Sequence, residues 1–274
     1  MDIIKFIIEV TRRCTLNCEH CFRGEAENID IEEDTIINSL KDVNSIKKLV
    51  ITGGEPFLVH EKLEIIAAII NEYNIYVQDI YVVTNGTVLN DKVRNVLNKL
   101  SKVGNLHISV SFDSFHEIEL ERKNLKQIRD KNTKELIENY NAIEYGHTPN
   151  DIAGDYMLLI YPIGRAKNLT KERVKEIEDK YNKKFFISDI PRRNNGGSFS
   201  PEGKLSDVSI DINGNVVIYQ SSFNEENEYS SVSNTNVNEI GLYDAVCNHI
   251  KNIGLEYEVE TIEQYERKYG QRQK

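Results

Sequence analysis

The sequence predicts an α/β protein: a partial (βα)6 TIM-like barrel with a small C-terminal hairpin-plus-helix extension. Two observations lead to this fold class. Over the first 190 residues, six short apolar runs alternate with segments of helical spacing. After that point the pattern changes to loops, one hairpin and one helix. Six βα units are too few for a full eight-fold barrel, so we expect three quarters of one or an open parallel sheet.

The predicted strands are rich in β-branched residues and nearly continuous in apolar character, which is typical of strands buried on both faces of a parallel sheet. The first strand is Ile3 to Val10, and the others are expected at 48–51, 80–83, 106–110, 156–161 and 185–187. The helical segments between them lie at 32–43, 59–72, 91–100, 119–145 and 171–181. In either kind of sheet, functional residues gather at the carboxyl ends of the strands.

The C-terminal part has a different character. A loop rich in Asn, Gly and Ser is followed by two alternating apolar runs around Asn213-Gly214, which is the strongest short-range signal of a β-hairpin. A helix is predicted over 239–250. We therefore expect a core of residues 1–190 and an extension of residues 191–274 that covers the barrel mouth.

Composition limits the class of protein. The chain has 34 Lys and Arg against 44 Asp and Glu, a net charge of −10, which argues against a nucleic-acid partner. Its apolar runs are far shorter than the roughly 18 residues that a membrane helix needs. Its four cysteines do not make a disulfide scaffold, and no secretory signal is visible. We expect a soluble, cytoplasmic protein with no membrane partner.

Three of the four cysteines, Cys14, Cys18 and Cys21, fall within eight residues directly after the first predicted strand. In a reducing compartment, clustered thiols indicate a metal site or catalysis rather than a disulfide. One alternative is zinc, with His20 as the fourth ligand. Zinc sites usually draw their ligands in two separated pairs, however, and the sequence has no second pair. The other alternative is an iron–sulfur cluster with three cysteine ligands, which leaves one iron open to a substrate or cofactor.

The CxxxCxxC spacing resembles the signature of the radical S-adenosylmethionine (radical SAM) superfamily, with His20 in place of the family's aromatic residue. The family's second motif is matched by Gly53-Gly54-Glu55-Pro56 directly after the second predicted strand. The resemblance covers about residues 3–190. It implies a 4Fe-4S cluster at Cys14, Cys18 and Cys21 that binds SAM. It also implies a low-potential electron donor, such as a flavodoxin or ferredoxin, and a 5′-deoxyadenosyl radical that abstracts a substrate hydrogen atom.

The same resemblance suggests further site residues. Gly53, Gly54 and Glu55 would contact the methionyl end of SAM, and Pro56 belongs to the same motif but is also a typical first helical residue. Residues at the ends of later strands would contact the rest of SAM, and the candidates are Asn85, Ser111, Asp113 and Arg165. Ordinary turns, helix caps and a surface arginine are the structural alternatives. His116 is a candidate acid or base on the substrate side.

The predicted hairpin resembles the start of a SPASM or twitch extension, in which additional cysteines hold auxiliary clusters. Here Gln220 stands where the first of these cysteines would fall, and only Cys247 comes later, so we predict no auxiliary cluster. Cys247 shares helical spacing with Ile240, Tyr243 and Ile250, which indicates a buried apolar thiol. The alternative is a hydrogen-atom donor, as in some peptide-epimerising members of the superfamily.

Three functions remain open from the sequence. The first is modification of a peptide or protein, which the SPASM-like hairpin favours. The second is chemistry on a nucleotide or another small molecule, because Ser111 to Phe115 resembles a segment of viperin-type enzymes. The third is a non-catalytic protein that binds zinc or a cluster, against which the two intact motifs argue.

Overall fold

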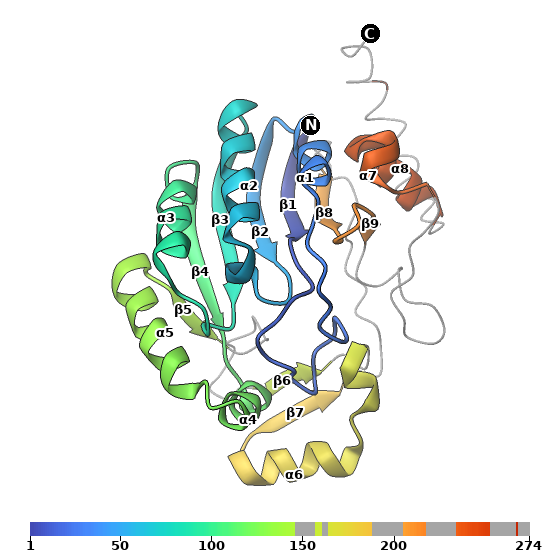
Figure 1. The fold of residues 1–274 in the computed structure, drawn as a ribbon. Coiled ribbons are helices and arrows are strands. Elements are labelled where there is room, and N and C mark those ends of the chain that lie inside the picture. The colour runs from blue at the N-terminus through green and yellow to red at the C-terminus, as the bar shows by residue number, and fades with distance from the viewer. Residues whose placement is uncertain (146–156, 161–163, 188–204, 218–233, 253–266, 268–274) are drawn as a thin grey trace.

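The computed structural model describes residues 1–145, 157–160, 164–187, 205–217, 234–252 and 267 (Figure 1). Its main sheet contains β1 (Asp2–Glu9), β2 (Ser45–Thr52), β3 (Tyr76–Thr84), β4 (Asn105–Ser111), β5 (Ile143–Tyr145), β8 (Leu205–Ile210) and β9 (Val216–Val217). A separate parallel pair contains β6 (Met157–Ile160) and β7 (Lys184–Ile187). The order of the main sheet is β5-β4-β3-β2-β1-β8-β9, and every neighbouring pair is parallel except β8 with β9.

The parallel register brings β-branched side chains into rows across the sheet. Ile8, Ile51, Val82 and Ile108 occupy one register position on four adjacent strands, and each is at most 1% exposed. Burial of one such side chain stabilises the fold by about 1.5–3 kcal/mol relative to exposure. These rows explain why the strands read as nearly continuous apolar runs.

Helices follow the strands in the order that the alternating pattern predicts. They are α1 (Glu33–Leu40), α2 (His60–Glu72), α3 (Asp91–Leu100), α4 (Ser114–Arg122), α5 (Lys126–Tyr140), α6 (Lys171–Tyr181), α7 (Val237–Ile240) and α8 (Leu242–Asn252), with short 3-10 turns η1 (Pro56–Val59) and η2 (Gly164–Asn168). Helices α1, α2 and α3 lie along one face of the sheet (Figure 1). Because β1 to β4 are parallel, all four end at the same edge of the sheet, where the loops that follow them meet.

The α/β class and the mostly parallel sheet of a partial TIM-like barrel are confirmed, and all six predicted strands are present. The single helix predicted over 119–145 is wrong. The chain leaves the helix near Asn124, whose φ is +56°, and the last three residues of that range form strand β5 beside β4. A second asparagine with positive φ, Asn141, ends α5. Asparagine tolerates this left-handed conformation better than most residues, which makes it a helix terminator.

The predicted hairpin is also present. Its turn contains Gly214 at φ +87°, and the Asp211 carboxylate accepts hydrogen bonds from the backbone N–H groups of Asn213 and Asn215. Strand β8 pairs with β1 in parallel, so the described part of the extension continues the sheet past β1. The expected boundary near residue 190 falls outside the described residues, and covering of the mouth by other parts of the extension stays a prediction.

No helix in the described ranges combines the length and the apolar character that crossing a membrane requires.

His249 on α8 provides a test of the packing of the extension. Its side chain is fully buried, and burial lowers its pKa to about 4. Between about pH 7.5 and pH 5 the unfolded chain takes up a proton at this residue that the folded chain does not, so the free energy of unfolding falls by about 2 kcal/mol.

Urea unfolding of the wild type and of His249→Gln at both pH values would measure this contribution. The variant should lose less stability than the wild type as the pH falls. Equal losses in the two proteins would show that His249 is not buried as described.

Candidate active site

A cavity of about 190 Å³ opens at the edge where β1 to β4 end. It brings together nine of the residues predicted from the sequence: Cys14, Cys18, Cys21, Gly53, Gly54, Asn85, Ser111, His116 and Arg165. Four others, Glu55, Pro56, Asp113 and Cys247, do not line it. The predicted site therefore corresponds to a cavity in the structure, although not every residue predicted for it lines that cavity.

The three clustered cysteines lie on the loop after β1. Cys18 is buried, and Cys14 and Cys21 are partly buried. Burial raises the pKa of Cys14 to about 11, and it raises the pKa of Cys18 well above its ordinary value. Such thiols are protonated and poorly nucleophilic at neutral pH. A metal centre binds the deprotonated thiolate, so binding of a metal at these cysteines would release their protons.

The arrangement around these cysteines favours an iron–sulfur cluster over a zinc ion. His20, the fourth zinc ligand considered above, directs its Nε2 atom at the Asp113 carboxylate, 3.1 Å away. Among the described residues, the three cysteines do not form a group whose donor atoms all lie within 4.8 Å of one another, as a single tetrahedral zinc requires. In a 4Fe-4S cluster each thiolate binds a different iron, so the sulfur atoms stand farther apart.

Gly53 and Gly54 allow the end of β2 to pack directly against the loop that carries the cysteines. Gly54 N donates to Thr11 O at 2.7 Å, and Glu55 N donates to Arg13 O at 2.8 Å. A Cβ atom on Gly54 would lie 2.2 Å from Arg13 O, and one on Gly53 would lie 2.6 Å from Thr11 O. The sequence predicted a close approach between these glycines and a ligand. The structure adds a close approach to the backbone that leads into Cys14.

Glu55 is fully buried, and both of its carboxylate oxygens accept hydrogen bonds from other residues of the chain. One oxygen accepts hydrogen bonds from Phe57 N at 3.1 Å and Thr84 Oγ1 at 2.8 Å, and the other accepts from Asn85 N at 2.7 Å. Burial raises its pKa to about 7, although the three hydrogen bonds oppose that shift. Glu55 thus joins the ends of β2 and β3. Pro56 is buried at the first position of η1, as its helix-start interpretation predicts.

Asn85 links this arrangement to a predicted cluster ligand. Its Nδ2 atom donates to Thr15 Oγ1 at 3.0 Å and to Cys14 Sγ at 3.6 Å. Its Oδ1 atom accepts from the backbone N–H and the hydroxyl of Thr87 at 3.0 and 2.7 Å. The sequence predicted a contact between Asn85 and SAM. The observed partners are the cysteine loop and Thr87, and the contact with SAM stays a prediction. Hydrogen bonds to cluster sulfurs tune the reduction potential.

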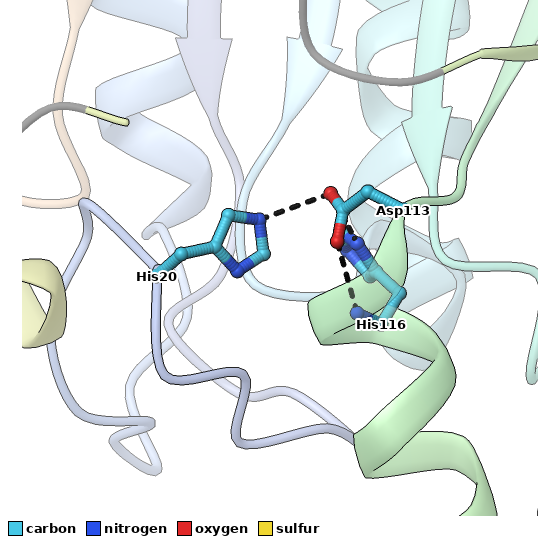
Figure 2. A group of neighbouring side chains, drawn as sticks. All are labelled: His20, Asp113 and His116. Carbon is cyan, nitrogen blue, oxygen red and sulfur yellow. Dashed lines mark hydrogen bonds and ion pairs between the residues drawn. The ribbon is translucent and has the colours of Figure 1, made fainter. Parts of the chain in front are cut away.

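Asp113 forms a buried group with His20 and His116 (Figure 2). Its Oδ1 atom caps α4 by accepting from Phe115 N and His116 N at 2.9 and 3.0 Å. Its Oδ2 atom lies 3.1 Å from His20 Nε2 and 2.8 Å from His116 Nδ1. Burial opposes its ionisation, but the two imidazoles hold the pKa of Asp113 well below its ordinary value. Sequence reasoning singled out each residue but missed the group, because His20 is distant along the chain.

Arg165, at the start of η2, also holds the cysteine loop. Its backbone N–H donates to Cys21 O and its Nε to Cys18 O, both at 2.9 Å. Its guanidinium additionally contacts Asn17 and pairs with Glu25 at 3.5 Å. Arg165 thus has a carboxylate partner within the chain, Glu25, and its predicted contact with SAM stays a prediction.

Cys247 lies on α8 in the main hydrophobic core and is 3% exposed. This position agrees with the buried-thiol interpretation. It lies outside the cavity lining, so the described structure does not bring Cys247 to the cysteine loop.

Comparison with known proteins decides the family. The family model described as the radical SAM superfamily matches residues 8–177, which is more than half of the chain. The chain belongs to the radical SAM superfamily. It is therefore an enzyme, and the cofactors of the family are a 4Fe-4S cluster and SAM. The non-catalytic alternative is set aside by this membership.

The curated relatives are similar to this chain over a shorter stretch than the family model is. A probable GTP 3′,8-cyclase of Methanocaldococcus jannaschii is 36% identical over 120 residues, 42% of this chain and 38% of that protein. A putative L-lysine 2,3-aminomutase of Aquifex aeolicus is 30% identical over 115 residues, 36% of this chain and 30% of that protein. The chain thus matches less than two fifths of either relative. A solved structure of anSMEcpe with bound AdoMet and the Cp18Cys peptide has a TM-score of 0.49 at 11% identity, with 97% of this chain and 84% of that chain covered.

The contact between Gly54 and the cysteine loop can be tested by substitution. Gly54→Ala places a Cβ atom 2.2 Å from the backbone at Arg13, so the loop must move away. We expect the reconstituted variant to hold less than about half of the wild-type iron and sulfide, since ligands need fixed geometry to bind. Iron and sulfide analysis after anaerobic reconstitution measures this loss.

Gly241→Ala is the matched control. It introduces strain at φ +80° in open space between α7 and α8, and it should cost about 1 kcal/mol of stability with no loss of cluster. Full cluster content in Gly54→Ala would contradict the structural role given to this glycine.

Proposed function

We propose that Cys14, Cys18 and Cys21 hold the 4Fe-4S cluster, that the adjoining cavity binds SAM, and that the enzyme modifies a peptide or protein substrate. The chemistry that these cofactors supply is reductive cleavage of SAM to a 5′-deoxyadenosyl radical, which abstracts a hydrogen atom from the substrate. A low-potential flavodoxin- or ferredoxin-like protein is the proposed electron donor. The cytoplasm is the proposed location, because free thiols persist in a reducing compartment.

The polar groups around the cavity have separate proposed tasks. Gly53 and Gly54 present backbone to the methionyl end of SAM, and Ser111 presents a hydroxyl from the end of β4. Arg165 keeps the cysteine loop in place through the carbonyl groups of Cys18 and Cys21. His116 lines the cavity, and its Nδ1 atom lies 2.8 Å from the Asp113 carboxylate, the arrangement expected of a proton donor or acceptor for the substrate.

The observation that supports a peptide most directly is the charge balance at the cavity. Three arginines line it, and each has a carboxylate partner: Arg12 with Glu27 at 3.1 Å, Arg23 with Glu9 at 2.8 Å, and Arg165 with Glu25 at 3.5 Å. A nucleoside triphosphate carries several negative charges and would have to displace these carboxylates from the arginines. A peptide backbone has no net charge and does not require such displacement.

A nucleotide is the second candidate, because several curated relatives are named as probable GTP 3′,8-cyclases. Their similarity covers less than half of each relative, so it supports the shared catalytic core more than the substrate.

The proposal is tested by anaerobic reconstitution, reduction with dithionite and detection of 5′-deoxyadenosine by mass spectrometry. The wild type should cleave SAM, and the variant with all three cysteines replaced by alanine should not. Addition of a mixed-sequence peptide library should raise the rate at least about tenfold more than addition of GTP, because only a bound substrate consumes the radical productively. Stimulation by GTP alone would contradict the peptide assignment.

A further inference from the structure

We propose that His20, Asp113 and His116 form a binding site for one divalent transition-metal ion, separate from the three-cysteine site. The proposal does not depend on which substrate the enzyme uses. It rests on three side chains that converge beside the cavity, which His20 and His116 line (Figure 2).

The donor atoms have the spacing of a metal site. His20 Nε2, Asp113 Oδ2 and His116 Nδ1 all lie within 4.8 Å of one another, and the two nitrogen–oxygen distances are 3.1 and 2.8 Å. Two ligands of one tetrahedral ion at about 2.1 Å are about 3.4 Å apart. An ion can therefore enter this group with small side-chain adjustments. Within the part of the chain that the structure describes, this is the one group of three potential ligands with such spacing.

The three side chains are held in place before any ion binds. The Oδ1 atom of Asp113 is engaged in the cap of α4, which leaves Oδ2 directed at the imidazoles. The His20 ring stacks on the Phe115 ring with ring centroids 4.6 Å apart. The His116 ring contacts the His20 ring edge-on, with centroids 5.2 Å apart. Fixed ligand orientation of this kind is the role of the residues that surround metal ligands in known sites.

Burial and charge also favour a cation. The side chains of His20, Asp113 and His116 are 8%, 6% and 10% exposed. A divalent ion bound between the two imidazoles and the carboxylate would neutralise the buried charge of Asp113 directly.

The ligand types select the class of ion. Imidazole nitrogen with one carboxylate oxygen suits Zn²⁺, Fe²⁺ or Co²⁺, whereas Mg²⁺ and Ca²⁺ prefer oxygen ligands. Three protein ligands leave at least one coordination position open. Because both imidazoles line the cavity, that position would be reachable by an oxygen or nitrogen atom of a bound molecule.

The test uses Co²⁺ as the probe on the cluster-loaded enzyme, in which the three cysteines are already occupied. Visible spectroscopy and metal analysis after anaerobic dialysis should show about one cobalt per chain with unchanged cluster iron. Asp113→Asn keeps the helix-capping oxygen, and His116→Gln keeps a polar side chain. Each should weaken cobalt binding at least about tenfold.

His107→Gln is the matched control, because His107 forms an ordinary histidine–carboxylate pair with Asp79 at 3.0 Å on the sheet surface. It should bind cobalt as the wild type does. The proposal is overturned if the wild type binds no cobalt beyond its cluster, which would leave the three residues as a hydrogen-bonded clamp. It is also overturned if Asp113→Asn and His116→Gln both bind cobalt like the wild type, since the ion would then lie elsewhere.

Discussion

Two backbone hydrogen bonds between the end of β2 and the residues before Cys14 organise the whole site. They run from Gly54 N to Thr11 O and from Glu55 N to Arg13 O, and they form only because neither Gly53 nor Gly54 carries a Cβ atom. The contact fixes the start of the cysteine loop against the sheet. Because the loop and the glycines border the same cavity, this contact positions both the thiols proposed to bind the cluster and the backbone proposed to receive SAM.

The same contact places the Glu55 carboxylate at the end of β3. A buried carboxylate is costly unless its oxygen atoms are hydrogen-bonded, and Glu55 receives donors from η1, from Thr84 and from Asn85. Asn85 in turn donates to Cys14 Sγ. The two motifs of the family are thus connected through the end of β3. On the other side of the loop, Arg165 and the pair of His20 with Asp113 hold the segment around Cys18 and Cys21.

The strands and the location of the site could be predicted from the sequence because both depend on local sequence patterns. Runs of Ile and Val mark the strands, and the positions of Cys14 and Gly53 after two strands locate the site. The break at Asn124 was missed because an isolated asparagine is a weaker signal than the helical spacing around it. The pairing of β8 with β1 and the meeting of His20 with Asp113 depend on tertiary contacts between distant segments, which no local pattern encodes. For Glu55 the motif left open a contact with SAM or a role at the start of the next helix, because motif position does not reveal which way a side chain points; its hydrogen bond from Phe57 N agrees with the second.

The central claim is that the three cysteines hold a 4Fe-4S cluster with one iron open to SAM. Electron paramagnetic resonance of the reduced, reconstituted enzyme with and without SAM tests it most directly. The account predicts four irons per chain and a spectrum that changes when SAM is added, because SAM binds the iron that no cysteine occupies. A reduced cluster whose spectrum is indifferent to saturating SAM would contradict the account. So would a protein that binds zinc at the cysteines and assembles no cluster.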